Sequence, residues 1–96
     1  MYEGLKAGRD ANYDFGESEL NTLGYQLLYG DKKPDDAVAI FRLNTAEHPK
    51  SSNAFDSLGE AYSRNGQKSL AIESYQTAVK LDPSNGHAVS MLKQLK

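Results

Sequence analysis

The chain has 96 residues, of which 39% are hydrophobic and 25% charged, with a formal net charge of −2 at pH 7. These values are typical of one small globular domain, and the charge gives no cationic surface of the kind that binds nucleic-acid phosphates. The sequence contains no cysteine, which excludes disulfides, thiolate catalysis and cysteine-ligated zinc sites in this chain. No apolar run is long enough for a signal peptide or a membrane span, so we expect neither here, and the compartment stays open.

The start of the chain, residues 1–16, is expected to form an N-terminal extension or connector. Tyr2 and Leu5 are spaced for a short helix, whereas the stretch that follows has the polar and glycine residues typical of a connection. Tyr13 and Phe15 are candidates to pack this segment onto the next part of the chain.

Residues 17–51 are expected to form a first pair of helices, at about 18–29 and 34–47. Pro34 suits the first turn of the second helix, because the N–H that proline lacks would have no helical partner there. The stretch YGDKKPD between the two helices has the composition of a turn.

Residues 52–85 are expected to form a second pair. Ser51 or Ser52 can cap its first helix, in which apolar residues recur at helical spacing. This helix is predicted to end near Gly66, because glycine readily adopts the left-handed conformation of a helix C-terminus. The second helix is predicted over residues 68–81 and ends at the Asp-Pro that follows.

The last segment, residues 86–96, begins like a third pair and then ends. Val89 and Leu92 occupy its apolar anchor positions, and Lys93 stands where the first helices of both pairs have glycine. We therefore predict a capping helix that covers the apolar face of the second pair.

The two pairs are copies of one pattern. LNTLGYQL in the first aligns with FDSLGEAY in the second, where Gly24 precedes Gly59 by 35 residues. Further along, Pro49 precedes Pro83 by only 34 residues. The first pair therefore has one extra residue, which we place in the turn YGDKKPD.

A glycine in the middle of each first helix needs a reason, since it costs about 1 kcal/mol relative to alanine. Two antiparallel helices joined by a short turn must pack closely. We therefore predict that Gly59 lets bulky groups of the second helix approach, such as those around Ala71 and Tyr75.

These positions resemble the tetratricopeptide repeat (TPR), whose 34-residue unit reads Trp-x-x-Leu-Gly-x-x-Tyr, followed by Ala, an aromatic residue, Ala and Pro. The second pair matches at Phe55, which replaces the Trp, and at Leu58, Gly59, Tyr62, Gly66, Ala71, Tyr75, Ala78 and Pro83. The first pair matches at Leu20, Leu23, Gly24, Leu27, Ala37, Phe41 and Pro49, but has Asn44 in place of the last Ala. The resemblance implies an all-α, right-handed helical array of two helix-turn-helix repeats plus a C-terminal capping helix.

The resemblance also implies a peptide or partner helix bound on the concave face, which the first helix of each repeat lines. The positions that correspond to the family's groove are Asn21, Tyr25, Leu28, Tyr29, Asn53, Asp56, Glu60, Ser63 and Arg64, followed on the capping helix by His87 and Ser90. Tyr25 and Tyr29 share one helix face, and they either meet a partner or pack against residues 1–16. The basic clamp that some members use for C-terminal carboxylates has no counterpart, since its positions hold Asn21, Tyr25, Ser57, His87 and Met91.

Motifs for catalysis or metal binding are nearly absent, so we expect no enzymatic activity, metal or cofactor. His48 and His87 have no partner at a metal-ligand spacing and are interpreted as surface histidines. SMLK, at residues 90–93, matches the Ser-x-x-Lys of penicillin-recognising hydrolases without any companion motif. Asn44 is expected to be buried and to bond a nearby backbone group or a Ser or Asn side chain.

Three hypotheses for function follow. The leading one is a non-catalytic protein–protein interaction module within a larger protein, with no nucleic-acid or membrane partner. Its partner would be a separate protein or peptide, a domain of the same parent, or a second copy in a weak homodimer. A second resemblance, carried by SELNTLGYQLL and SNAFDSLGEAY, is to the C-terminal TPR tails of bacterial esterase-like and beta-lactamase-like serine hydrolases. It implies the alternative of a structural appendage that stabilises or dimerises such a parent, and an independent enzyme is the third hypothesis.

Overall fold

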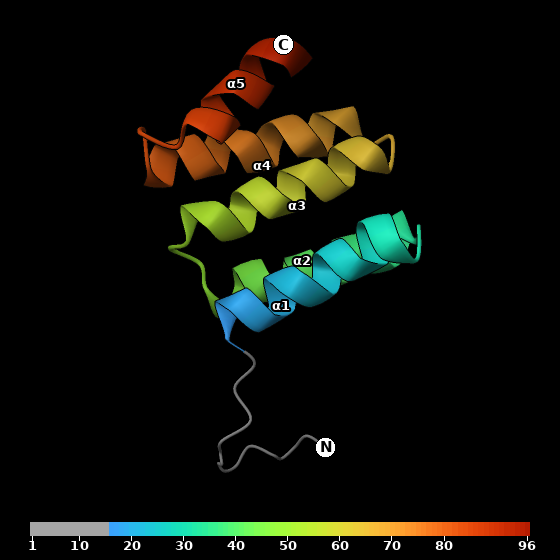
Figure 1. Cartoon of the computed structure of the whole chain (residues 1–96). Helices are drawn as coiled ribbons and strands as arrows, with labels where there is room; N and C mark the ends of the chain where they lie inside the picture. Colours follow the sequence, from blue (N-terminus) through green and yellow to red (C-terminus); the bar gives the residue numbers. More distant parts are fainter. Residues whose placement is uncertain (1–15) are drawn as a thin grey trace.

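The computed structural model describes residues 16–96, which are all-α and contain no strand (Figure 1). Its helices are α1 (Glu17–Tyr25), which continues as the π-helix η1 (Gln26–Gly30), then α2 (Pro34–Glu47), α3 (Ser52–Arg64), α4 (Lys68–Leu81) and α5 (Gly86–Leu95). The two predicted pairs and the terminal helix are thereby confirmed, whereas the expectations for residues 1–15 lie outside the described part. Within residues 16–96, no helix has the length and apolar character needed to cross a membrane.

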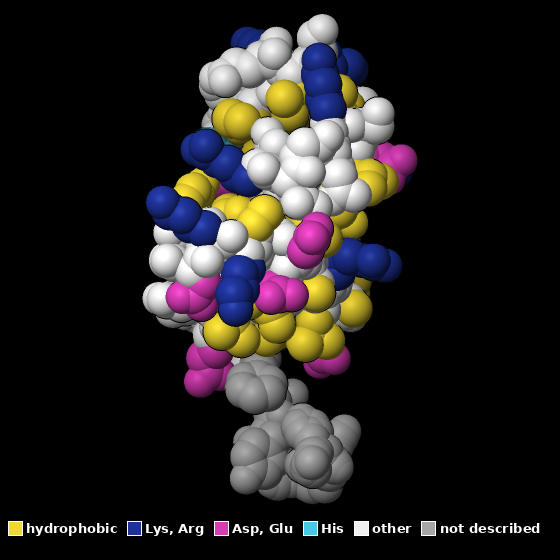
Figure 2. Space-filling model, turned by 90° about the vertical axis from the view of Figure 1, so that its right-hand side faces the viewer, with side chains coloured by type: hydrophobic (Ala, Val, Ile, Leu, Met, Phe, Trp, Pro, Cys, Tyr) yellow, Lys and Arg dark blue, Asp and Glu magenta, His cyan; other side chains and the backbone are white. Residues whose placement is uncertain are grey.

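The helices stack in chain order as two antiparallel pairs followed by α5 (Figure 1). The core lies between successive helices and combines small residues with two large aromatic rings, Phe41 and Tyr75, both fully buried. Met91, Leu92 and Leu95 of α5 pack on this core from the far side of the second pair. Some hydrophobic side chains stay at the surface, and Figure 2 shows a group of them at the end formed by α1 and α2.

The glycine prediction is confirmed in both pairs. An ideal Cβ built on Gly59 would lie 2.9 Å from Cζ of Tyr75, and one built on Gly24 would lie 2.5 Å from Cζ of Phe41. Such distances leave no room for a methyl group, so each glycine allows an aromatic ring of the second helix to rest on the backbone of the first. The buried ring offsets the low helix propensity of glycine.

The extra residue of the first pair lies in the last turn of the first helix rather than in the turn alone, which corrects the sequence prediction. The N–H of Asp31 donates to the carbonyl of Gln26 at 2.9 Å, closing a wide π-type turn. The N–H of Lys33 donates to the carbonyl of Leu27, six residues earlier. The equivalent bond of the second pair, from Gln67 to Tyr62, spans five residues.

Both pairs leave their first helix through a residue with positive φ. In the second pair this residue is Gly66 (φ 77°), as predicted, whereas in the first it is Lys32 (φ 55°). The two residues are 34 apart, so they are equivalent positions. A side chain makes this conformation less favourable than it is for glycine, so the residue type at Lys32 does not predict it.

Helix caps link each first helix to the next one along the stack. Ser51, which caps α3 by accepting from the N–H of Ala54 at 3.0 Å, also donates to Oε2 of Glu17 at 2.7 Å. Asn85, which caps α5, donates to Oγ of Ser52 at 2.9 Å. Glu17 and Ser52 are the first residues of α1 and α3, so the same connection occurs twice.

The buried Asn44 behaves as the sequence predicts. Its Nδ2 donates to the backbone carbonyl of Glu17 at 3.3 Å, and the residue is fully buried. Its Oδ1 has no hydrogen-bond partner within residues 16–96. In the second pair the equivalent residue is Ala78, and the link runs the other way, because Oγ of Ser52 donates to the carbonyl of Ala78 at 2.7 Å.

Candidate partner-binding surface

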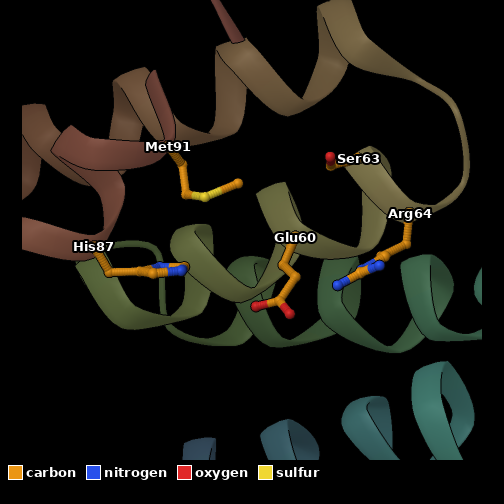
Figure 3. A pocket seen from close by; sticks show the side chains of 5 residues that line it. All are labelled: Glu60, Ser63, Arg64, His87 and Met91. Atoms are coloured by element: carbon orange, nitrogen blue, oxygen red, sulfur yellow. The ribbon is translucent and has the colours of Figure 1, made fainter. Parts of the chain in front are cut away.

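A hollow opens between α3 and α5 on the side formed by the first helices of the stack. Glu60, Ser63 and Arg64 of α3 line it together with His87 and Met91 of α5, around a volume of about 420 Å³. In Figure 3, the carboxylate of Glu60 lies between the side chains of His87 and Arg64, and Met91 extends over the hollow from α5. The lining therefore offers an acceptor, donors and a polarisable apolar group within one small surface.

A hydrogen-bonded bridge joins α1 and η1 to α3 beside this hollow. The hydroxyl of Tyr25 lies 3.2 Å from Oε1 of Glu60 and 3.1 Å from Oγ of Ser57, and its single proton can go to either. Ser57 in turn donates to Oδ1 of Asn21 at 2.6 Å. The hydroxyl of Tyr29 donates to Oε2 of Glu60, so one carboxylate receives both tyrosines.

The rings of this bridge form a stack that reaches the rim of the hollow. Tyr25 and Tyr29 lie parallel with centroids 6.0 Å apart, and Tyr25 also packs against Phe41 of the core in a T-shaped arrangement. The guanidinium carbon of Arg64 lies 5.4 Å from the centroid of the Tyr29 ring, within cation–π range. The stack fixes the exposed ring of Tyr29 and orients Arg64 at the edge of the hollow.

Burial and the nearby carboxylates keep the bridging tyrosines protonated. Burial is the main cause that raises the pKa of Tyr25 to about 12, and Glu60 adds to it. Burial and the hydrogen bond to Glu60 also raise the pKa of Tyr29. Both phenols therefore remain hydrogen-bond donors throughout the neutral range.

The other side of the hollow is held by a pair between α3 and α5. Nδ1 of His87 lies 2.7 Å from Oδ1 of Asp56, a mostly buried carboxylate. His87 lies at the surface, as the sequence predicts, but it also anchors the capping helix to α3 through this contact. Its ring also meets Tyr75 edge-on, with centroids 6.2 Å apart. The buried hydroxyl of Tyr75 has no partner among the described residues, and burial raises its pKa.

The predicted site residues fall into four groups. The bridge contains Asn21, Tyr25 and Tyr29, and the hollow contains Glu60, Ser63 and Arg64. Asp56 forms a hydrogen bond with His87, and the exposed Asn53 donates to Oε2 of Glu17 at 3.4 Å. Leu28 lies in the hydrophobic core with 6% of its surface exposed, so it contributes packing rather than contact surface.

The predicted groove positions included His87 on the capping helix but left out Met91, which also lines the hollow. The repeat period could have identified Met91 as well, because His87 and Met91 lie 34 residues after Asn53 and Ser57 on the preceding first helix. Extending the period from α3 into the capping helix places both residues on the same face as the predicted set. Within residues 16–96, no His, Asp and Glu side chains gather as they would to hold a metal ion.

Comparison with known proteins identifies one of the two helical pairs. Residues 52–85, which cover α3, α4 and the turn after them, match the family model of the tetratricopeptide repeat. No curated protein matches the chain. Repeats of this family generally serve protein–protein interaction and are generally non-catalytic. Residues 52–85 therefore form a tetratricopeptide repeat within an all-α helical array, and repeats of this kind bind other proteins.

Proposed function

We propose that this domain binds an extended peptide or a partner helix across the face formed by α1, α3 and α5, with the hollow between α3 and α5 as the main contact. One observation carries the proposal: five side chains of different chemistry, from two helices, surround an open volume on this face. Partner sites in proteins combine apolar contact with a few placed polar groups in this way.

The chemistry of the lining indicates what the partner segment offers. Met91 contacts an apolar side chain, and the guanidinium of the exposed Arg64 donates to a carbonyl or a carboxylate. Ser63 supplies a hydroxyl that can accept from or donate to a peptide backbone. The exposed ring of Tyr29 extends the contact toward α1, because tyrosine combines a large apolar area with few rotatable bonds.

The bridge serves this function as a support. Its hydroxyls are already bonded to Glu60, so the tyrosines hold the wall of the hollow before any partner arrives. A preformed wall reduces the entropy lost on binding. A separate protein, or another domain of a longer parent protein, can supply the partner segment, since either presents the same chemistry to this face.

Selection from a random-peptide display library on the 96-residue chain tests the proposal. Selected peptides are expected to lose at least about tenfold in affinity on Arg64→Ala and on Ser63→Trp, which fills the hollow. Lys68→Ala, an exposed charge on α4 outside the lining, is the matched control and should bind like the wild type. Equal binding by all three variants, or a library that yields no binder, would contradict the proposal.

A further inference from the structure

The far end of the stack, formed by α5 and the last turns of α4, carries a second groove. Val79, Val89, Leu92, Lys93 and Lys96 line it, and we refer to these five residues as the α5 end. The floor is apolar, and two lysines stand at its edge. Helix α5 contains no Asp or Glu, so its charges at this end are of one sign.

The opposite end of the stack has the complementary character. Leu23 of α1 and Leu43 of α2 are 45% and 44% exposed. Each leucine shares its helix face with acidic residues. On α1, Glu19 lies four residues before Leu23. On α2, Asp36 lies seven residues before Leu43 and Glu47 lies four residues after it. We refer to Glu19, Leu23, Asp36, Leu43 and Glu47 as the α1–α2 end. Figure 2 shows hydrophobic and acidic side chains together in this region.

We infer that the α5 end of one molecule docks on the α1–α2 end of a second copy, head to tail. Both ends present apolar side chains that lose contact with water on docking, and their charges are opposite in sign. Across α1 and α2 there are five acidic residues and one basic residue, Arg42, whereas α5 has Lys93 and no acid.

Charge decides the orientation of the contact. A symmetric pair of α5 ends would bring Lys93 and Lys96 against their own copies, and a symmetric pair of α1–α2 ends would bring carboxylates together. The head-to-tail arrangement avoids both repulsions. Because it leaves one free end of each kind, the contact does not close on itself, and open chains of molecules form as the concentration rises.

This association is independent of the proposed partner site, since the hollow between α3 and α5 shares no residue with either end. Sedimentation equilibrium of the full chain gives the first test. The weight-average mass is expected to rise with concentration to roughly twice 10.6 kDa or beyond, and to fall when salt screens the charges. A mass that stays at one molecule over the whole concentration range would overturn the inference.

Two single-end variants give the decisive test. Leu43→Ser weakens the α1–α2 end and Val89→Ser weakens the α5 end, and neither residue belongs to the buried core. Each variant alone is expected to stay at the mass of one molecule, whereas their equimolar mixture forms a dimer through the one intact end of each. Leu70→Ser, which removes an exposed leucine from α4, is the control and should associate like the wild type.

The association of the two variants distinguishes a head-to-tail contact from a symmetric one. If only Val89→Ser abolishes association, the contact is a symmetric pair of α5 ends, and if only Leu43→Ser does, it is a symmetric pair of α1–α2 ends. Either result overturns the head-to-tail contact, as does a mixture that remains at the mass of one molecule. Circular dichroism of each variant verifies that its helices are intact.

Discussion

The two helical pairs of this chain are built on one pattern, yet they differ where the ends of their helices meet. Each rests an aromatic ring on a glycine, Phe41 on Gly24 and Tyr75 on Gly59. The first pair, however, has a π-turn, a non-glycine residue with positive φ and a buried asparagine, where the second has a regular end, a glycine and an alanine. The comparison teaches that close helix contacts in the middle of a repeat tolerate little change, whereas its ends accept different local solutions.

The largest effect is expected from exchanging the buried residues at the ends of the pairs. Ala78→Asn should destabilise the second pair by about 3 kcal/mol, because it forces a larger polar side chain into a fully buried position whose carbonyl already accepts from Ser52. Urea unfolding followed by circular dichroism measures the change.

The reciprocal variant, Asn44→Ala, is expected to have a much smaller effect on stability. Asn44→Ala loses the bond to Glu17 and leaves a small void, but it also removes the unpartnered Oδ1. These contributions oppose one another, so we expect a change below about 1 kcal/mol. If Asn44→Ala and Ala78→Asn lower the free energy of unfolding equally, the explanation for the different residues at this position is wrong.

A methyl group on either mid-helix glycine gives the next largest effect. Gly24→Ala is expected to destabilise by about 2 kcal/mol and Gly59→Ala by about 1 kcal/mol, since overpacking outweighs the gain in helix propensity. The order follows from the shorter approach at Gly24. Thermal unfolding measures both, and Gly59→Leu should lower the midpoint further. Gly86→Ala, with no atom within 4 Å of the added Cβ, is the control that should not destabilise.

The hydroxyl of Tyr25, which joins the two helical pairs, is expected to contribute less to stability than the close contacts at the glycines. Tyr25→Phe should cost about 1 kcal/mol at neutral pH, because it removes the bond to Glu60. The folded-state pKa of Tyr25 is raised from 10.0 to about 12, so its contribution is complete below pH 10 and is lost as the pH rises through about 12. Stability measured across this window should therefore fall more steeply in the wild type than in the variant. Parallel pH profiles would contradict the bridge.

The smallest effect is expected at the positive-φ positions. Lys32→Gly should stabilise the first pair by about 0.5 kcal/mol, because glycine removes the cost of the left-handed conformation but adds entropy to the unfolded chain. The reverse change, Gly66→Lys, should destabilise the second pair by about 1 kcal/mol. Chemical unfolding of both variants measures the pair, and a Lys32→Gly variant less stable than the wild type would refute the explanation.

Much of this molecule follows from local sequence alone. Helical periodicity, the cap at Ser51, the proline at the start of α2 and the glycine at position 66 determine where the helices begin and end, because each acts within a few residues. The 34-residue spacing of small and aromatic residues determined which helices pair, since a glycine can admit only a ring that lies opposite it. It also indicated the face on which most of the candidate site lies.

The tertiary structure decided what the candidate residues do on that face. Tyr25 and Glu60, and likewise Tyr29 and Arg64, are equivalent positions 35 residues apart, and their contacts arise only because α1 and α3 lie side by side. The same stacking buries Leu28 and joins His87 to Asp56. Local propensity cannot predict these contacts, because they depend on the offset and rotation of one helix pair against the next. The place of the one-residue insertion was likewise decided by the fold, which absorbs it in the π-turn of η1.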